Sequence, residues 1–401
     1  MNAQTQIGIP HEKRGGPPIL SLLKANIREY AMYIALLVIF IVFGAATNGL
    51  FLSPRNLTDL INQTGYVAVL AVGMTIILII KHIDLSVGYV AGFMGAVAAM
   101  LLSRGTHVLA VIPIILALGI VIGMYQGFLV AKVKVPAFVT TLAGMFIFRG
   151  CLSRVTTATG TIIVRDTVFR SFSNGFIPDW FHGNGIHILT LMIGVLGALA
   201  VAASQFRSRR NMRRYDFKVS SPSTFAGTLA LSVALVIVVF WMLAHYKGLP
   251  WTAVIVGVVL LIYHFILSKT PLGRSVYAIG GNTEAAELSG VNVAKVTFLA
   301  FCSMSLLAAL SGILYTSRMA SATPTAGLGF EMDAIASSYI GGVSVSGGVG
   351  KVTNTLVGAL VIISLTNGMN LMGVDISFQY MLKGAIFILA VAFDIISRRQ
   401  A

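Results

Sequence analysis

Charged residues are scarce in this chain of 401 residues. Only 10% of the residues are Asp, Glu, Lys or Arg, whereas 57% are hydrophobic. A soluble globular domain carries roughly 25% charged residues. A large core cannot account for the deficit, because a surface that faces water still needs polar side chains. The composition therefore excludes a soluble domain and indicates a protein that crosses a bilayer many times.

Cysteine is also scarce, with only Cys151 and Cys302 in the chain. Both lie within or beside apolar runs, where a cysteine behaves as a small apolar packing residue. This position favours a packing role over a disulfide or a metal ligand, and we expect no metal site.

Motifs for enzyme chemistry are missing as well. The nearest approach to a phosphate-binding loop, residues 346–353, has Val352 where the G-x-x-x-x-G-K-[ST] pattern needs Ser or Thr. Val345 stands where the pattern needs its first glycine, and apolar runs flank the segment instead of a strand and a helix. No H-E-x-x-H or G-x-S-x-G motif occurs. We therefore expect no enzyme, and energy for any transport must come from a partner or an ion gradient.

Positive charge, in contrast, is in excess. The chain has 28 Lys and Arg against 13 Asp and Glu, a formal net charge of +15. The charges fall between apolar runs, and no basic face with interleaved aromatic residues appears, so we expect no nucleic-acid partner. The pattern fits the rule that Lys and Arg hold loops on the cytoplasmic side of a membrane.

The apolar runs predict an all-α fold, a polytopic bundle of about 10–12 transmembrane helices, since a bilayer core needs about 20 apolar helical residues. The run 334–350 is short and is predicted to be a broken or re-entrant segment, which must be covered by protein or line a water cavity. The predicted spans are 31–47, 64–80, 87–103, 108–130, 136–153, 187–204, 225–246, 250–268, 294–317, 334–350, 352–372 and 378–396.

Charge then predicts the orientation of a single transmembrane domain, residues 31–397. The first 30 residues are polar and basic without a cleavable signal, so segment 1–30 is expected in the cytoplasm. The loops 204–224 and 269–293 then fall on the same side, as does the C-terminus with Arg398 and Arg399. The weakly basic outer loop 154–186 argues mildly against this orientation, but inversion would expose the densest basic cluster. That cluster is Arg207, Arg209, Arg210, Arg213, Arg214 and Lys218.

Three glycines in one span share a helix face. Gly119, Gly123 and Gly127 form a double GxxxG pattern, which allows two membrane helices to approach closely. Chance spacing is an equal alternative in a chain with 41 glycines, and both interpretations stay open.

Ionisable residues inside the spans are few. Asp84, Asp333, Asp375 and Asp394 lie near the ends of predicted spans, and His264 is the clearest ionisable residue within one. A carrier coupled to an ion gradient usually buries such groups at midmembrane. A lone histidine is more often a packing residue, so an ion-coupled carrier remains the lesser alternative.

The loop 269–293 contains a short helix with its own start and stop signals. Asn282 suits the N-cap, Glu284 and Glu287 lie toward the positive N-terminal end, and Gly290 suits a left-handed stop. The helix should lie outside the membrane. It is either a plain connector or a docking helix that fits a groove in a partner.

This loop resembles the coupling segment of bacterial ABC sugar-importer permeases of the ribose, xylose and galactose branch. Three further stretches resemble the same family in the same order, at 73–88, 321–336 and 341–350, and together the four are highly specific. The family-motif residues among them are Asp84, Ser86, Gly88, Pro324, Glu331, Asp333, Gly341, Gly342, Gly347 and Gly348.

The resemblance implies a permease subunit in the bacterial inner membrane that has no cofactor of its own. It implies a second permease copy in a homodimer, membrane lipid around it, a cytoplasmic ATPase that binds ATP and Mg, and a periplasmic sugar-binding protein. It also implies that the ATPase drives alternating access through the coupling residues. These residues are Gly280, Gly281, Asn282, Thr283, Glu284, Glu287, Leu288 and Gly290.

Region 187–246 looks like two extra spans absent from the shorter ribose-type permeases. It resembles the xylose-type and multiple-sugar permeases, so the expected cargo is xylose or several sugars. A path for neutral, hydroxyl-rich sugars should be polar without charge. Asn367, Asn370 and Gln379 are candidates for it, although hydrogen bonds between helices are an alternative role.

Overall fold

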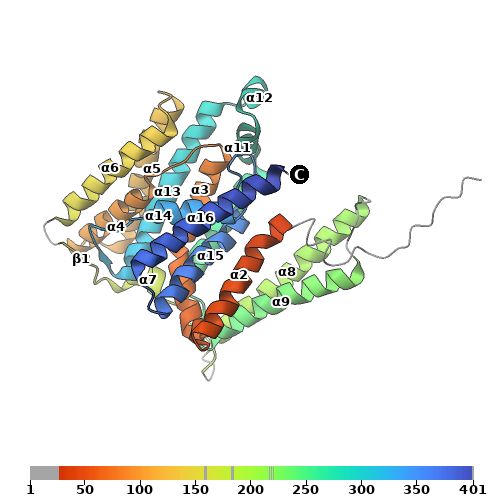
Figure 1. Cartoon of the computed structure of the whole chain (residues 1–401). Coiled ribbons are helices and arrows are strands. Elements are labelled where there is room, and N and C mark those ends of the chain that lie inside the picture. Colours follow the sequence, from red (N-terminus) through yellow and green to blue (C-terminus); the bar gives the residue numbers. More distant parts are fainter. Residues whose placement is uncertain are drawn as a thin grey trace, which may run out of the picture.

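Helices dominate the fold throughout the computed structural model, which describes residues 27–157, 160–181, 185–215, 217, 219 and 221–399 (Figure 1). One two-stranded antiparallel pair, β1 (Ile162–Ile163) with β2 (Ser321–Ala322), is the sheet within these residues. The helices are α2 (Ile27–Ala46), η1 (Leu50–Leu52), α3 (Pro54–Ile79), α4 (Val87–Ser103), α5 (Val108–Ala131), α6 (Ala137–Thr156), α7 (Thr167–Asn174), α8 (Ile188–Arg214), α9 (Pro222–Ala244), α10 (Trp251–Lys269), α11 (Pro271–Gly281), α12 (Thr283–Leu288), α13 (Val293–Met319), α14 (Phe330–Ile340), α15 (Val352–Leu371) and α16 (Ile376–Arg399).

The helix lengths confirm the predicted polytopic bundle. Nine of the described helices are long and apolar enough to cross a membrane, and two shorter apolar helices cover Ala31–Ala46 and Val87–Ser103. Helix α14 has 11 residues, so it rises only about 16 Å, roughly half of a bilayer core. A turn and loop follow it up to α15. The predicted broken segment near 334–350 is therefore confirmed.

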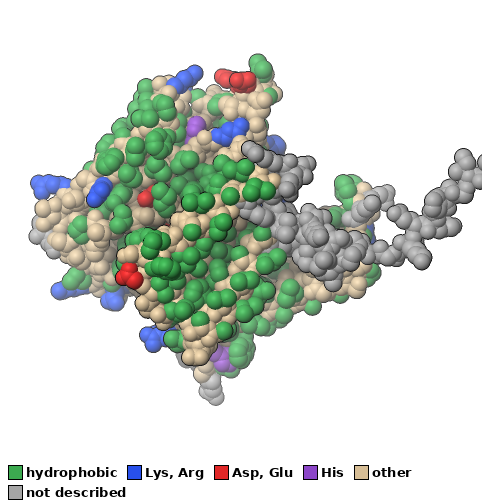
Figure 2. Space-filling model, viewed as in Figure 1, with side chains coloured by type: hydrophobic (Ala, Val, Ile, Leu, Met, Phe, Trp, Pro, Cys, Tyr) green, Lys and Arg blue, Asp and Glu red, His purple; other side chains and the backbone are tan. Residues whose placement is uncertain are grey.

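Helices α3 and α13 form the centre of the bundle. In α3, 83% of the apolar window is buried, and this helix packs against α13, α14, α15 and α10. Helix α13 in turn packs against α5, α3 and α4. The outer helices present apolar side chains outward, and Figure 2 shows them covering much of one face over α14, α15 and α16, with Lys and Arg near its rim.

Helix α5 crosses α13 at very short range along its glycine face. A Cβ at Gly119 would lie 2.6 Å from the Ala309 Cβ, and one at Gly127 would lie 2.9 Å from the Phe298 carbonyl oxygen. A Cβ at Gly123 would lie 2.5 Å from the Cα of Cys302. Only glycine fits these points without separating the helices, so the double GxxxG pattern marks a tight crossing.

Helices α8 and α9 form a hairpin that packs mainly on itself. Figure 1 shows it leaning away from the rest of the bundle. Helix α8 continues to Arg214, so most of the basic segment expected as loop 204–224 is helical, and the loop prediction was too long. Arg, Met and Gln favour helix, which explains why α8 extends beyond its apolar part. Lys218 lies outside the described residues.

Candidate functional site

The predicted short helix exists and is capped as expected. The Asn282 side chain accepts a 3.0 Å hydrogen bond from the Ala285 backbone N–H and begins α12. Gly290 follows the helix with φ 84°, a left-handed conformation that glycine adopts without strain. The sequence therefore specified both ends of this element, although its docking role stays a prediction.

Helix α12 stands at one end of the bundle and carries exposed side chains (Figure 1). Glu284, Glu287 and Leu288 are exposed, and Leu288 is 91% exposed. Ala286 on the opposite face is buried. A leucine with this exposure, which follows the two acidic residues on the helix, contributes almost nothing to packing within the chain, so this surface is free to contact a partner.

The end of α11 meets the bundle through backbone atoms. A Cβ at Gly280 would overlap the carbonyl oxygen of Ile79 and would lie 2.5 Å from the backbone nitrogen of Gly348. The N–H of Gly348 donates to the same Ile79 carbonyl at 2.9 Å. Gly348 has φ 72°, so both its conformation and its surroundings require glycine. We call the contact of Gly280 and Gly281 with Ile79 and Gly348 the backbone junction.

Two side chains close the backbone junction on either side. Lys81 Nζ donates to the Gly281 carbonyl at 3.2 Å, and Tyr277 Oη donates to the Gly350 carbonyl at 2.7 Å. Burial raises the pKa of the Tyr277 hydroxyl, which keeps it protonated as a donor. These bonds attach α11 to both the end of α3 and the glycine-rich loop 341–351.

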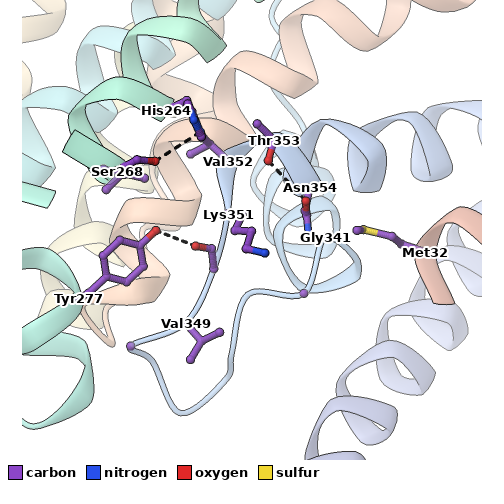
Figure 3. A pocket seen from close by; sticks show the side chains of 14 residues that line it. Met32, His264, Ser268, Tyr277, Gly341, Val349, Lys351, Val352, Thr353 and Asn354 are labelled. Carbon is purple, nitrogen blue, oxygen red and sulfur yellow. Dashed lines mark hydrogen bonds between the residues drawn. The ribbon is translucent and has the colours of Figure 1, made fainter. Parts of the chain in front are cut away.

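A cavity of about 480 Å³ lies beside the backbone junction, between α2, α10, α11 and the start of α15. Figure 3 shows Tyr277, Val349 and Lys351 around it, with Ser268 and His264 on one wall and Met32 on the other. His264 is exposed here and approaches the Ser268 hydroxyl at 3.5 Å. It therefore lies at the end of the bundle rather than at its middle, where a proton relay would be expected.

The motif at 83–88 folds back into the bundle as a buried loop between α3 and α4. Asp84 and Ser86 are both fully buried. The Ser86 backbone N–H and hydroxyl donate to Asp84 Oδ1 at 2.9 and 2.6 Å, and Gln126 Nε2 of α5 donates to Ser86 Oγ at 2.7 Å. Non-helical backbone inside a membrane protein needs such cover, and the glycine at position 144 leaves space for it.

Two of the family-motif stretches pack against each other. A Cβ at Gly88 would overlap the carbonyl oxygen of Gly327 and Glu331 Oε2. The stretch 73–88 therefore touches the stretch 321–336 directly. Pro324 is exposed on the turn between β2 and α14. Glu331 is buried, and its Oε2 has no hydrogen-bond partner among the described residues.

The glycine-rich motif forms the loop between α14 and α15. A Cβ at Gly341 would lie 2.7 Å from the Cα of Thr355 in α15. Gly342 and Gly347 have φ 86° and 78°, so this loop turns sharply where only glycine is free of strain. The loop lets α14 return along α15 instead of continuing across the bilayer.

A charged pair that the sequence reasoning missed joins α14 to α16. Lys383 Nζ lies 3.0 Å from Asp333 Oδ1 and 3.2 Å from Oδ2. A lysine in the middle of an apolar span is a recognised signal for function or pairing, and it could have been found in the sequence. Asp394 is buried in α16, whereas Asp375 is exposed before this helix.

The three predicted path residues lie in contacts between helices. Asn367 accepts a 3.0 Å bond from Asn56 Nδ2 of α3 and approaches Gln63 Oε1 at 3.5 Å. Gln379 Nε2 donates to Asn370 Oδ1 at 2.7 Å and joins α15 to α16. The geometry favours the alternative role as packing bonds, and their role in a sugar path stays a prediction.

The sequence reasoning also missed an aromatic cluster that contains the first residue of α14. The ring centroids of Tyr66, Tyr315 and Phe330 lie 4.9 to 5.2 Å apart. They come from α3, α13 and α14, so no local pattern in the sequence brings them together. Tyr66 and Tyr315 are partly exposed, and Asp333 lies three residues after Phe330 on α14.

Comparison with known proteins identifies relatives along nearly the whole chain. Residues 56–391 match the family described as branched-chain amino acid transport system permease component. The xylose transport system permease protein XylH of Escherichia coli (strain K12) is 38% identical over 383 residues, which cover 95% of each chain. The Haemophilus influenzae XylH is 36% identical, covering 95% of this chain and all of the relative. The ribose import permease protein RbsC of Haemophilus influenzae is 34% identical and covers 91% and 93% of the two chains. No solved structure matches.

Proposed function

The chain belongs to the branched-chain amino acid transport system permease component family, and from this premise we propose that it carries a monosaccharide through an ATP-driven importer. The observation that supports a sugar over an amino acid is the identity of 38% and 34% to full-length xylose and ribose permeases. Xylose, or several sugars that include it, is the proposed cargo. The chain is a multi-pass membrane permease of the inner membrane and not an enzyme.

The proposed assembly has two copies of this permease, an ATPase that binds ATP and Mg on the cytoplasmic side, and a periplasmic sugar-binding protein on the other side. Helix α12 is the proposed contact with the ATPase, because Leu288 is exposed at the end of the bundle. This assignment puts the start of α2 and the end of α16 in the cytoplasm. A reporter that is active only in the periplasm, fused after Phe217, should stay inactive.

The proposed mechanism is alternating access driven from α12. When the ATPase subunits close, they displace α12, and the backbone junction passes this displacement to the end of α3 and to loop 341–351. Helices α14 and α15 follow, since they are connected by that loop. Such motions of packed helices as rigid bodies are common in transporters and allosteric proteins.

The sugar is proposed to pass the aromatic cluster at the start of α14. Binding sites for small molecules combine aromatic walls with a few polar groups, and here the Tyr66 and Tyr315 rings lie near the Asp333–Lys383 pair. Neutral sugars can hydrogen-bond such a pair without adding net charge. Asn367 of α15, which contacts Asn56 and Gln63 of α3, is proposed as a further polar residue of the path.

The proposal is tested by transport in proteoliposomes that contain the permease, its ATPase and the sugar-binding protein. Xylose uptake should need ATP and all three components. Uptake by the permease alone in response to a proton or sodium gradient would contradict the proposal and support the ion-coupled carrier.

The coupling contact is tested by Leu288→Asp. The side chain is 91% exposed, so the variant should fold and reach the membrane normally. A charge in a buried apolar contact costs several kcal/mol, so uptake and co-purification of the ATPase should fall to background. Ser289→Asp is the matched control, because it adds the same charge at the next exposed position. Wild-type uptake together with wild-type co-purification of the ATPase in Leu288→Asp would show that α12 is only a connector.

A further inference from the structure

The α8–α9 hairpin has a surface that transport by the central bundle does not explain. Only 17% of the α8 window and 6% of the α9 window are buried, and the two helices pack mainly on each other. Exposed apolar residues cover both helices before the basic end of α8, among them Leu196, Leu199, Leu231 and Leu235. Such a hairpin is immersed in lipid over most of its length, so its end must meet the membrane surface.

The basic end of this hairpin lies on the same side of the bundle as α12. Helix α8 begins at Ile188, and the backbone N–H of its N-cap residue His187 donates to the Ala244 carbonyl, close to the segment that leads into α10. Helix α10 runs from there to Lys269, immediately before α11. Because α8 is about 40 Å long, its last turns reach the α12 side, at the level of the lipid headgroups.

Four arginines at this end are exposed and gather around one hollow. Arg207, Arg210, Arg213 and Arg214 line a hollow of about 570 Å³ together with Asn211. The guanidinium groups of these four residues make no hydrogen bond or ion pair within the described part of the chain. Neither helix contains an Asp or a Glu, and Asp216 between them is outside the described residues. The arginine cluster, as we call these four residues, therefore concentrates positive charge, and the described residues of α8 and α9 supply no acidic side chain to it.

A fifth arginine of α8 is packed within the hairpin, in contrast to the four exposed ones. Arg209 is buried, and its guanidinium lies 4.3 Å from the centre of the Phe225 ring of α9. The four cluster residues are exposed instead. Tyr215 and Phe217, which follow them, are 69% and 67% exposed, and aromatic residues of this kind are typical of the membrane–water interface.

We propose that the arginine cluster binds the phosphate-containing headgroup of an anionic phospholipid and so attaches the α8–α9 hairpin to its leaflet. Arginine binds phosphate oxygens through paired N–H donors. Basic residues at the surface of a leaflet are attracted by anionic lipids. A lipid fits better than a soluble anion, because the cluster continues the lipid-facing surface of α8. The inference does not depend on which cargo the permease carries.

The experiment measures lipid binding to the full chain in mixed micelles, with Tyr215→Trp as a local fluorescent reporter. The probe is a phosphatidylglycerol with brominated acyl chains, which quenches a tryptophan on contact, and brominated phosphatidylcholine is the neutral comparison. The native Trp180, Trp241 and Trp251 lie at the opposite end of the hairpin, and their signal is subtracted with the same titration of the chain that keeps Tyr215. Phosphatidylglycerol should quench the reporter at a much lower mole fraction than phosphatidylcholine.

The variant Arg210→Gln with Arg214→Gln should weaken phosphatidylglycerol binding on the order of 25-fold, at roughly fivefold for each charge removed. The control variant, Lys132→Gln with Lys134→Gln, removes two exposed charges from the α5–α6 loop and should change binding less than twofold. Arg210→Lys with Arg214→Lys, which keeps the charge and the fold, should retain most of the binding.

Three results would overturn the proposal. Equal quenching by the two lipids would show that the headgroup is not recognised. An equal loss of binding in Arg210→Gln with Arg214→Gln and in Lys132→Gln with Lys134→Gln would show only a general effect of surface charge. Full displacement of the lipid by millimolar inorganic phosphate would show a site for a soluble anion instead.

Discussion

The crossing of α5 and α13 should not tolerate even one methyl group at Gly123. A Cβ built there would lie 2.5 Å from the Cα of Cys302 and 2.7 Å from the carbonyl oxygen of Phe301. Both are backbone atoms, so no side-chain rotation can relieve the contact. Because carbon atoms pack best at about 3.5–4.0 Å, Gly123→Ala must separate the two helices by about 1 Å at this point.

The cost of this change follows from two opposing effects. Overpacking a well-packed interior costs about 1–3 kcal/mol. Alanine favours the helix over glycine by about 1 kcal/mol, which offsets part of that cost. Gly123→Ala should therefore lower the free energy of unfolding by up to about 2 kcal/mol. Gly123→Leu adds three more carbon atoms at the same place and should prevent the crossing from forming.

The matched control is Gly257→Ala in α10, where a Cβ would meet nothing within 4 Å. The measurement is the fraction of purified permease that remains monodisperse on size exclusion after heating in detergent. The control should equal or exceed the wild type, whereas Gly123→Ala should lose stability and Gly123→Leu should yield little folded protein. Wild-type stability and transport in Gly123→Leu would refute the reasoning and make the glycine spacing incidental.

Two further predictions concern the backbone junction and the charged pair. Gly348→Ala should abolish uptake without removing the permease from the membrane, because φ is 72° and the new Cβ would lie 2.9 Å from the Gly281 nitrogen. Gly281→Ala is the control, since its Cβ would meet open space. Equal uptake by the two variants would contradict the role of the junction. Asp333→Asn and Lys383→Met should each destabilise the protein by about 1.5–3 kcal/mol, because each leaves one partly buried charge without its hydrogen-bonded partner. The double variant should recover most of the loss. Thermal stability of the four proteins tests this, and additive losses would contradict it.

Much of the fold could be predicted because each span is a local property of the sequence. A run of about 20 apolar residues must be a helix in lipid, and the predicted spans overlap the observed helices throughout. The end of α8 was the exception. Hydropathy falls at Gln205, where the apolar run leaves the bilayer, but Arg and Met favour helix in water as well. Hydropathy therefore predicts where the chain leaves the bilayer, whereas helix α8 continues beyond that point to Arg214.

The candidate site divides in the same way between local and distant interactions. Asn282 and Gly290 act on residues within one or two turns, so the start and end of α12 could be predicted. The Asp333–Lys383 pair joins residues 50 positions apart, and the aromatic cluster combines three helices. Such pairs depend on how the helices pack, and one sequence without an alignment does not contain that information.

The glycines of the backbone junction also give a physical reason why a displacement of α12 should travel far. Where two segments touch through side chains, rotamers can change and absorb a small displacement. At Gly280 and Gly348 the backbones themselves are in contact, so there is no side chain to yield. The next element, α3, is buried along most of its length and packs against α13, α14 and α15. Close-packed interiors transmit strain rather than absorb it, and α3 is therefore the element that we expect to carry the motion from α12 into the membrane.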